Sequence, residues 1–152
     1  MNIVIVGTGY VGLISGLCFS SVKHNVTCVD VNLETVAKLN KVQPPFYEKG
    51  LKELLENEFN SNRFSITTSL SEAMKNADII FLAVGTPASD DGSIDLSYIE
   101  SVAIQIGKNL KYIKRFISII IKSTVLPTTT DTFVRKIIEK YSEKKIGEFG
   151  LG

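Results

Sequence analysis

The chain has 152 residues, of which 44% are hydrophobic, and its 17 Lys and Arg residues nearly balance 16 Asp and Glu residues to give a formal net charge of +1. This length and hydrophobic content are enough for one domain with its own core, and they predict a single domain over residues 1–152. The charge balance argues against nucleic acid or an anionic membrane as a partner, and no apolar run reaches the roughly 20 residues that cross a bilayer.

The most informative segment is residues 3–12, which read Ile-Val-Ile-Val-Gly-Thr-Gly-Tyr-Val-Gly. The apolar run predicts a buried strand, and the apolar segment at residues 13–22 predicts a helix after it. Between them lies the Gly-x-Gly-x-x-Gly pattern of dinucleotide-binding βαβ units. In that pattern Gly7 allows a tight turn, Gly9 lets the backbone approach a pyrophosphate, and Gly12 lets the helix pack close to the strand. The N–H groups at the helix start then form an anion site.

A second predicted strand, residues 25–29, ends in Asp30, which lies 18 residues after Gly12. At this spacing an acidic residue accepts hydrogen bonds from the adenosine ribose of the dinucleotide. Its carboxylate would repel a 2′-phosphate, and residues 31–33 offer no arginine to hold one, so NAD is predicted rather than NADP. The alternative is that Asp30 caps a helix beginning near Asn32, and the two roles are compatible.

The rest of the chain alternates predicted helices and strands. We expect helices near residues 33–39 and 51–59, a strand at 64–66, a helix at 69–76 capped by Ser69, a strand at 78–84 buried on both faces, a polar loop at 88–93 with an Asp91-Gly92 turn, a helix from Asp95, a strand at 115–121 and a last helix at about 129–141. Near-continuous apolar strands separated by helices are typical of a parallel sheet covered on both faces. The predicted fold class is therefore α/β, with a doubly wound parallel sheet of the Rossmann type.

Ligands of such sheets bind beyond the carboxyl ends of the strands. Small and hydroxyl-bearing residues dominate three of the four segments that follow strand ends, at residues 7–12, 85–87 and 122–124, with Asp30 as the fourth. Their hydroxyl groups suit the phosphate, ribose or carboxamide groups of a dinucleotide. We predict further cofactor neighbours at Gly85, Thr86, Ser123 and Thr124. The alternative for the last two is that their hydroxyl groups cap a helix.

The two cysteines and the one histidine offer little chemistry. Cys18 falls in the first predicted helix and Cys28 in the second predicted strand, both at apolar positions, so we expect both in the core. Their spacing is not that of metal ligands, which predicts no metal site and favours a reduced, cytoplasmic protein. The N-terminal residues lack the basic region of a signal peptide, in keeping with that location. His24 lies in a turn, and a His-based catalytic site is poorly supported.

Several stretches together resemble one family in their order and spacing. They lie at residues 7–13, 26–30, 47–51, 77–81, 84–87, 91–98 and 122–125, and include Gly-Thr-Gly-Tyr-Val-Gly-Leu, Val-Gly-Thr-Pro and Lys-Ser-Thr-Val. This combination resembles the UDP-glucose/GDP-mannose dehydrogenase family, and within it the members that act on UDP-glucose. These enzymes oxidise the C6 alcohol of the sugar to a carboxylate with two NAD molecules, for polysaccharide biosynthesis. The resemblance implies a small-molecule nucleotide sugar as substrate and a homo-oligomer for the full-length enzyme.

The resemblance also implies roles for individual residues. It places Tyr10 and Val11 against the cofactor pyrophosphate and Asp30 on the adenosine ribose. Thr86 would lie beside the cofactor. Thr124 would help to place the catalytic water or a substrate oxygen.

The chain departs from the family pattern at three places. Thr35 stands where members often have a basic residue, which removes one adenosine-side contact, and residues 123–128 read Ser-Thr-Val-Leu-Pro-Thr where the family has Ser-Thr-Val-Pro-x-Gly. The family's catalytic cysteine, with its lysine and asparagine partners, belongs beyond residue 152. Glu148 and Phe149 lack the preceding Asn-Pro of the family's glutamate segment and do not take its role. We therefore expect a cofactor domain that lacks the nucleophile and the family's substrate-binding and C-terminal domains, and that is inactive by itself.

Three alternatives stay open from the sequence. The first is a sister specificity, for GDP-mannose or a UDP-N-acetylhexosamine. The second, from another class, is a nucleotide-binding or redox-sensing module without catalysis. The third is another Rossmann dehydrogenase such as a hydroxyacid enzyme, against which the Gly-Thr-Pro and Lys-Ser-Thr-Val segments argue.

Overall fold

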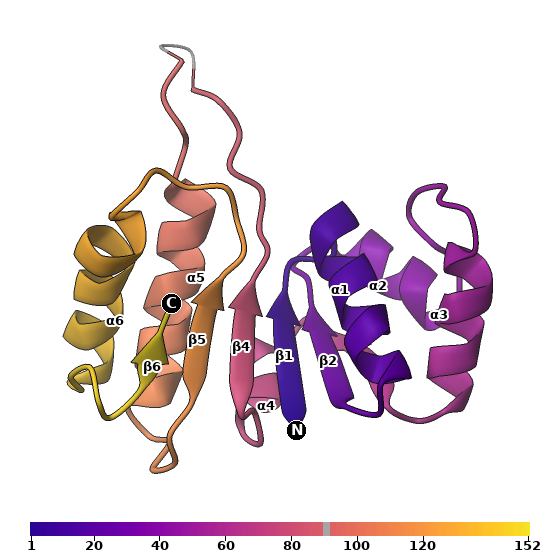
Figure 1. Cartoon of the computed structure of the whole chain (residues 1–152), viewed down its shortest axis with the longest axis horizontal. Helices are drawn as coiled ribbons and strands as arrows, with labels where there is room; N and C mark the ends of the chain where they lie inside the picture. Colours follow the sequence, from indigo (N-terminus) through magenta and orange to yellow (C-terminus); the bar gives the residue numbers. More distant parts are fainter. Residues whose placement is uncertain (90–91) are drawn as a thin grey trace.

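The computed structural model describes residues 1–89 and 92–152, and it shows a parallel sheet with helices on both faces (Figure 1). The strands are β1 (Asn2–Val6), β2 (Asn25–Val29), β3 (Phe64–Thr67), β4 (Ile79–Leu82), β5 (Ser118–Ile121) and β6 (Gly150–Leu151). The helices are α1 (Tyr10–Ser21), α2 (Leu33–Asn40), α3 (Leu51–Asn60), α4 (Leu70–Met74), α5 (Ser97–Leu110), the π-helical turn η1 (Thr130–Val134) and α6 (Arg135–Ser142). The strand order β3-β2-β1-β4-β5-β6 confirms the predicted doubly wound α/β fold.

The alternation of side chains along β1 builds two separate cores. Ile3 and Ile5 point to the face covered by α1 and α3, whereas Val4 and Val6 point to the face covered by α4 and α5. All four side chains are nearly inaccessible to solvent. A strand buried on both faces needs apolar residues at every position, which explains the continuous apolar run at the start of the sequence.

Most predicted elements are present, with shifted ends. The first helix begins at Tyr10 rather than at residue 13, and α5 begins at Ser97 rather than at Asp95, whose carboxylate accepts a hydrogen bond from the Ser97 N–H. Ser69 caps α4 as predicted, since its hydroxyl accepts a hydrogen bond from the Glu72 N–H at 3.3 Å. The last helix differs most, because its first turn is the π-helical η1. Of the predicted Asp91-Gly92 turn, Asp91 lies outside the described residues.

Two further expectations were wrong, and one strand had no expectation at all. The strand predicted at residues 78–84 is only β4, and its Ile79 and Phe81 are half-buried rather than buried. Cys18 is exposed, because the buried stripe of α1 runs through Leu13 and Leu17, whereas Cys28 is in the core as predicted. The short strand β6 was not predicted at all; it pairs with β5 and follows the fully buried Phe149.

No helix within residues 1–89 and 92–152 is both long enough and apolar enough to cross a membrane.

A buried carboxylate ties α1, α3 and β3 together at the amino end of the sheet. Glu58 on α3 is 6% exposed, and it accepts a 2.5 Å hydrogen bond from the Ser20 hydroxyl. The Arg63 guanidinium lies 3.6 Å from the same carboxylate oxygen and also donates to the Ser20 carbonyl. Removing the Glu58 carboxylate would leave the Ser20 hydroxyl and the Arg63 guanidinium without their acceptor, and an unpaired polar or charged group in the interior lowers the stability of the fold.

We expect Glu58→Ala to lower the free energy of unfolding by about 3 kcal/mol, discounted from the full cost of a broken buried pair because Arg63 is partly exposed. Urea denaturation measures the loss. Glu56→Ala is the matched control on the same helix, since Glu56 makes only an exposed 3.8 Å pair with Lys52 and should change the stability by less than about 0.5 kcal/mol. Equal losses in the two variants would contradict the structural role of Glu58.

Candidate functional site

The carboxyl ends of four strands meet at one edge of the sheet. Val6 of β1 lies beside Val29 of β2 and Leu82 of β4, and Leu82 in turn lies beside Ile121 of β5. The segments that follow these strands therefore start from the same level. The winding of the sheet reverses between β1 and β4, which is where open α/β sheets bind their ligands.

The three motif glycines differ in what a side chain would meet. Gly7 has φ +99°, and a Cβ there would lie 2.6 Å from the Ala83 carbonyl oxygen, so both the turn and the close approach require glycine. A Cβ on Gly12 would overlap the carbonyl oxygen of Gly7, which ties the helix start to the strand end. Gly9 has φ −65°, and a Cβ there would meet nothing within 4 Å. The protein's own atoms give Gly9 no reason to be glycine, as expected if a ligand occupies that space.

The backbone of α1 leaves donors free beside Gly9. Gly9 is the N-cap of α1, no side chain caps this helix, and its first turn holds no acidic residue. The first N–H groups of a helix have no intrahelical acceptor, and the helix dipole adds positive potential at that end. The arrangement suits a pyrophosphate, and the empty space at Gly9 gives it room.

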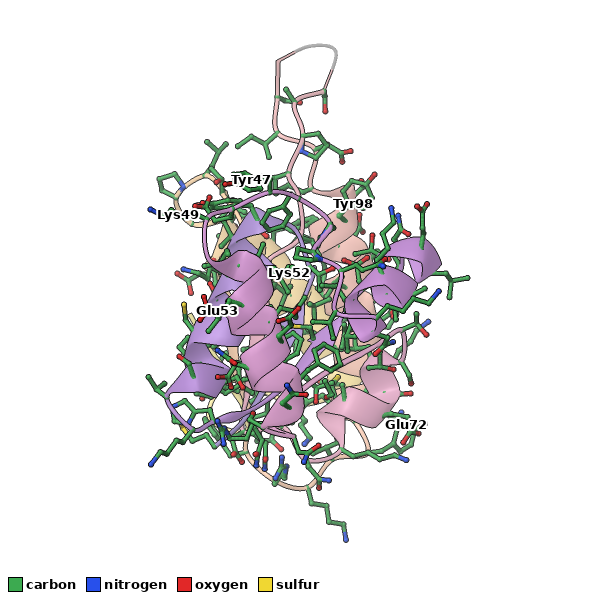
Figure 2. The ribbon with its side chains drawn as sticks, turned by 90° about the vertical axis from the view of Figure 1, so that its right-hand side faces the viewer. Tyr47, Lys49, Lys52, Glu53, Glu72 and Tyr98 are labelled. Atoms are coloured by element: carbon green, nitrogen blue, oxygen red, sulfur yellow. The ribbon has the colours of Figure 1, made fainter. Side chains whose placement is uncertain are left out.

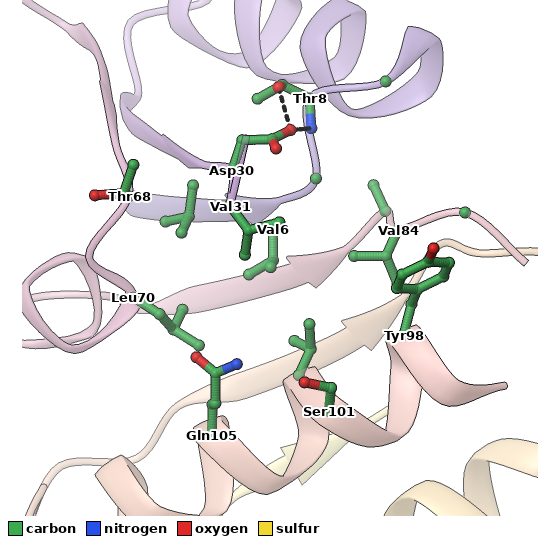
Figure 3. A pocket seen from close by; sticks show the side chains of 16 residues that line it. Val6, Thr8, Asp30, Val31, Thr68, Leu70, Val84, Tyr98, Ser101 and Gln105 are labelled. Atoms are coloured by element: carbon green, nitrogen blue, oxygen red, sulfur yellow. Dashed lines mark hydrogen bonds between the residues drawn. The ribbon is translucent and has the colours of Figure 1, made fainter. Parts of the chain in front are cut away.

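A cavity of about 450 Å³ opens beside these groups, between the ends of β1 and β2 and the helix α5 (Figure 3). Its lining consists of Val6, Gly7, Thr8, Gly9, Val29, Asp30, Val31, Thr68, Leu70, Ala83, Val84, Gly85, Tyr98, Ser101, Val102 and Gln105. Most of these side chains are apolar, and Val31 is 84% exposed to the cavity and solvent. An apolar crevice with a few polar groups suits a planar base and a sugar.

Among the described residues that line this cavity, Asp30 alone is charged. One of its oxygens accepts hydrogen bonds from the Thr8 N–H at 2.9 Å and from the Thr8 hydroxyl at 2.5 Å (Figure 3). The other accepts from the Asn32 N–H at 2.9 Å. The cap of α2 is Asn32, whose side chain accepts from the N–H groups of Glu34 and Thr35. The alternative role of Asp30 as that cap is therefore wrong.

Tyr10 and Val11 lie at the start of α1 but do not line the cavity. The Tyr10 hydroxyl donates to Glu48 at 2.8 Å, and its ring packs at 5.3 Å against Phe46 in the loop before α3. This hydrogen bond and the Glu48 charge raise the pKa of Tyr10 above its usual value, so the phenol stays protonated. Figure 2 shows the neighbouring Tyr47 on the same loop, with Tyr98 at the start of α5. The Tyr10 side chain is thus engaged by Glu48 and Phe46, whereas the backbone N–H groups of Tyr10 and Val11 belong to the first turn of α1, which has no intrahelical acceptor for them.

The other predicted cofactor neighbours divide into two groups. Gly85 lines the cavity, whereas Thr86, Ser123 and Thr124 do not. The Ser123 hydroxyl donates to the Val84 carbonyl at 2.6 Å and so links the ends of β4 and β5. Ser123 therefore caps no helix, and its hydroxyl hydrogen is already donated to the Val84 carbonyl. Thr124 is exposed beyond the same edge of the sheet.

Sequence reasoning missed several residues of the cavity. Thr8 carried a weak signal, since a hydroxyl inside a glycine motif can reach the acid at the end of the next strand. Tyr98, Ser101 and Gln105 follow a helical spacing on one face of α5, so their grouping was visible in the sequence. The sequence did not show which strand ends this face of α5 would cover.

The described residues hold no metal cluster, and the thiol of Cys28 is unreactive. No group of three or more His, Cys, Asp and Glu side chains within residues 1–89 and 92–152 could hold a metal ion. Burial, with a smaller effect from the Asp30 charge, raises the pKa of the Cys28 thiol to about 12. A thiol so hard to ionise is a poor nucleophile.

Comparison of the chain with known proteins identifies its relatives. The model of the UDP-glucose/GDP-mannose dehydrogenase family, NAD binding domain, matches residues 1–152. The chain is 38% identical over 138 residues to the UDP-glucose 6-dehydrogenase of Pseudomonas aeruginosa, covering 91% of this chain and 30% of that protein. It is 38% identical over 153 residues to the GDP-mannose 6-dehydrogenase of the same organism, covering 100% of this chain and 35% of that protein.

The solved structures agree with the sequence comparison. The crystal structure of a ternary complex of GDP-mannose dehydrogenase from Pseudomonas aeruginosa superposes with a TM-score of 0.96 at 38% identity, over 99% of this chain and 35% of that one. The chain thus spans about a third of the length of the relatives it matches.

Proposed function

The chain belongs to the UDP-glucose/GDP-mannose dehydrogenase family, as its NAD-binding domain, and from this we propose that it is the cofactor domain of a UDP-glucose 6-dehydrogenase. The observation that carries the proposal is the cavity at the β1–β4 switch point, which Asp30 and Gly9 both line, together with the open space that a Cβ on Gly9 would occupy. These residues fit NAD, since the cavity combines an anion site, one acidic acceptor and apolar walls.

The proposed reaction oxidises the C6 alcohol of the sugar to a carboxylate. Two hydrides leave C6, one in each oxidation, and one water oxygen enters. NAD, when bound, accepts each hydride. The part of this chain is to hold and orient the cofactor: the start of α1 binds the pyrophosphate, Asp30 accepts from the adenosine ribose, and Gly85 and Thr86 lie beside the cofactor. Thr124 is proposed to place a water or a substrate oxygen beyond the same sheet edge.

Two sugar nucleotides are candidates for the substrate. UDP-glucose is supported by the several UDP-glucose 6-dehydrogenases among the relatives, at 36 to 40% identity. GDP-mannose is the second candidate, because the GDP-mannose 6-dehydrogenase of Pseudomonas aeruginosa matches the whole chain at 38%. A single cofactor domain over residues 1–152, a cytoplasmic location and a homo-oligomeric enzyme stay predictions.

Cofactor choice tests the assignment of Asp30. We expect the chain to bind NAD at least about tenfold more tightly than NADP, because the Asp30 carboxylate repels a 2′-phosphate at close range. Isothermal titration calorimetry with both cofactors measures the ratio. Asp30→Asn removes the charge and keeps the shape of the side chain, so it should bring the affinities for NAD and NADP closer together. Equal or tighter binding of NADP to the unmodified chain would contradict the role of Asp30, and no binding of either cofactor would contradict the proposed function.

A further inference from the structure

Three side chains of α5 line the cavity opposite the strand ends. Tyr98, Ser101 and Gln105 follow one another at spacings of three and four residues, so they lie on one face of the helix. All three residues are exposed, whereas the other side of α5 is buried in the core. Tyr98 and Gln105 lie about 10 Å apart along the helix axis, so the two ends of this face can contact different parts of one ligand.

The Gln105 end of this face is the one that a nucleotide base would reach. A dinucleotide with its pyrophosphate at the start of α1 and its ribose at Asp30 places its base on the side of the ribose away from α1. Figure 3 shows Thr8, which precedes α1, on one side of Asp30, and it shows Val31, Leu70 and Gln105 on the other side. Val31 is 84% exposed and offers an apolar surface on which a planar ring can pack.

The side-chain amide of Gln105 is free to bind a ligand. Within residues 1–89 and 92–152 this amide forms no hydrogen bond with another residue, and Asn109 contacts only the backbone carbonyl of Gln105, at 2.8 Å. An amide carries a donor and an acceptor side by side, whereas a hydroxyl, as in Thr68 or Ser101, offers both on a single atom. Adenine presents a 6-amino donor beside a ring-nitrogen acceptor, and a glutamine amide can pair with both at once.

We propose that Gln105 recognises the base of the cofactor: its amide accepts a hydrogen bond from the 6-amino group of adenine and donates one to the adjacent ring nitrogen, while Val31 packs on the ring. Gln105 is then a specificity-determining residue for the adenosine half of the cofactor. The inference rests on the proposed binding of NAD and goes beyond it, because it names the side chain that distinguishes a 6-aminopurine from other bases.

The test compares ADP with the diphosphate of purine riboside, which lacks only the 6-amino group, by calorimetry on the unmodified chain. One neutral hydrogen bond contributes about fivefold in affinity, so we expect ADP to bind about fivefold more tightly than the analogue. Equal affinities would overturn the inference and leave the proposed function standing. Binding of NAD without detectable binding of ADP would also overturn the inference, because the affinity would then lie outside the adenosine half. If neither NAD nor ADP binds, the proposed function fails and the inference fails with it.

Variants of α5 assign the preference to the Gln105 amide. Gln105→Met keeps the length of the side chain and removes both polar atoms, so ADP and the purine riboside diphosphate should then bind within about twofold of each other. Gln105→Glu keeps an acceptor for the 6-amino group and should retain the preference for ADP. Lys108→Met is the matched control, since Lys108 is exposed on the same helix but does not line the cavity, and it should leave the ratio of the two affinities unchanged.

Thermal unfolding verifies that each variant is folded. The midpoint of Gln105→Met should equal that of the unmodified chain, because the Gln105 side chain is exposed and forms no hydrogen bond within residues 1–89 and 92–152. A preference for ADP that persists in Gln105→Met would mean that another group contacts the 6-amino group, and it would overturn the proposal. Loss of the preference in Lys108→Met would overturn it as well, since the effect would then not be specific to Gln105.

Discussion

Gly9→Val should abolish detectable NAD binding while leaving the protein folded. A Cβ at this position meets nothing within 4 Å, and φ of −65° is open to any residue, so the fold tolerates the side chain. The same side chain would fill the space in which the pyrophosphate approaches the backbone of α1. Loss of two charge-assisted hydrogen bonds corresponds to on the order of a hundredfold in affinity. Calorimetry measures binding, and circular dichroism with thermal unfolding verifies the fold.

Gly12→Ala is the control within the same motif, with the opposite expectation. Its Cβ would overlap the carbonyl oxygen of Gly7 and lie 3.3 Å from the Ala83 side chain, so α1 must move away from the strand. We therefore expect this smaller substitution to destabilise the fold itself. If Gly9→Val binds NAD as tightly as the unmodified chain, the pyrophosphate site lies elsewhere and the assignment of the cavity is wrong.

The alternation of strands and helices was predictable because each signal is local. Apolar runs such as residues 3–6 predict strands, and the structure has the five predicted strands side by side as β1 to β5, with residues 3–6 of β1 nearly inaccessible to solvent on both faces. The start of α1 was misplaced because a glycine N-cap with no capping side chain gives little sequence signal. The strand β6 could not be predicted, since Gly150 and Leu151 become a strand only by pairing with β5.

The site was predictable where the backbone carries the function. Gly7 and Gly9 are proposed to act through their lack of a Cβ and Asp30 through its place after a strand end, and all three line the cavity. The roles of hydroxyl groups were harder to predict, because the hydroxyl of a serine or threonine at a strand end can form a hydrogen bond either with a ligand or with a nearby protein acceptor. The Ser123 hydroxyl takes the carbonyl of Val84, and the Thr8 hydroxyl takes Asp30. Only the register of neighbouring strands decides between these outcomes.

The 152-residue chain by itself should form no NADH from UDP-glucose or GDP-mannose, however well it binds NAD. NAD readily oxidises an aldehyde to an acid through a thiohemiacetal, and forming this adduct needs a reactive thiolate. Cys28 is fully buried, with a pKa of about 12, and points into the core. Cys18 lies about 12 Å along α1 from its first residue and faces solvent. Neither thiol can reach a substrate at the carboxyl edge of the sheet.

Neither His24 nor Thr124 is suited to act as the general base of the first oxidation. His24, the one histidine of the sequence, lies at the opposite edge of the sheet, where its Nδ1 is 3.5 Å from the N-terminal nitrogen of Met1. Thr124 is at the correct edge, but a threonine hydroxyl is too weak a base to take the proton from an alcohol as hydride leaves.

Absorbance of NADH, with each sugar nucleotide and NAD, tests this expectation. The UDP-glucose 6-dehydrogenase and GDP-mannose 6-dehydrogenase of Pseudomonas aeruginosa serve as positive controls for the two substrates. Because NAD binding is measured separately, an inactive chain that binds NAD is a cofactor domain, and one that does not is misfolded or wrongly assigned. Turnover that survives repeated purification and disappears in Thr124→Ala would place the active site within these 152 residues. The catalytic base would then have to be sought around Thr124 rather than in residues that this chain lacks.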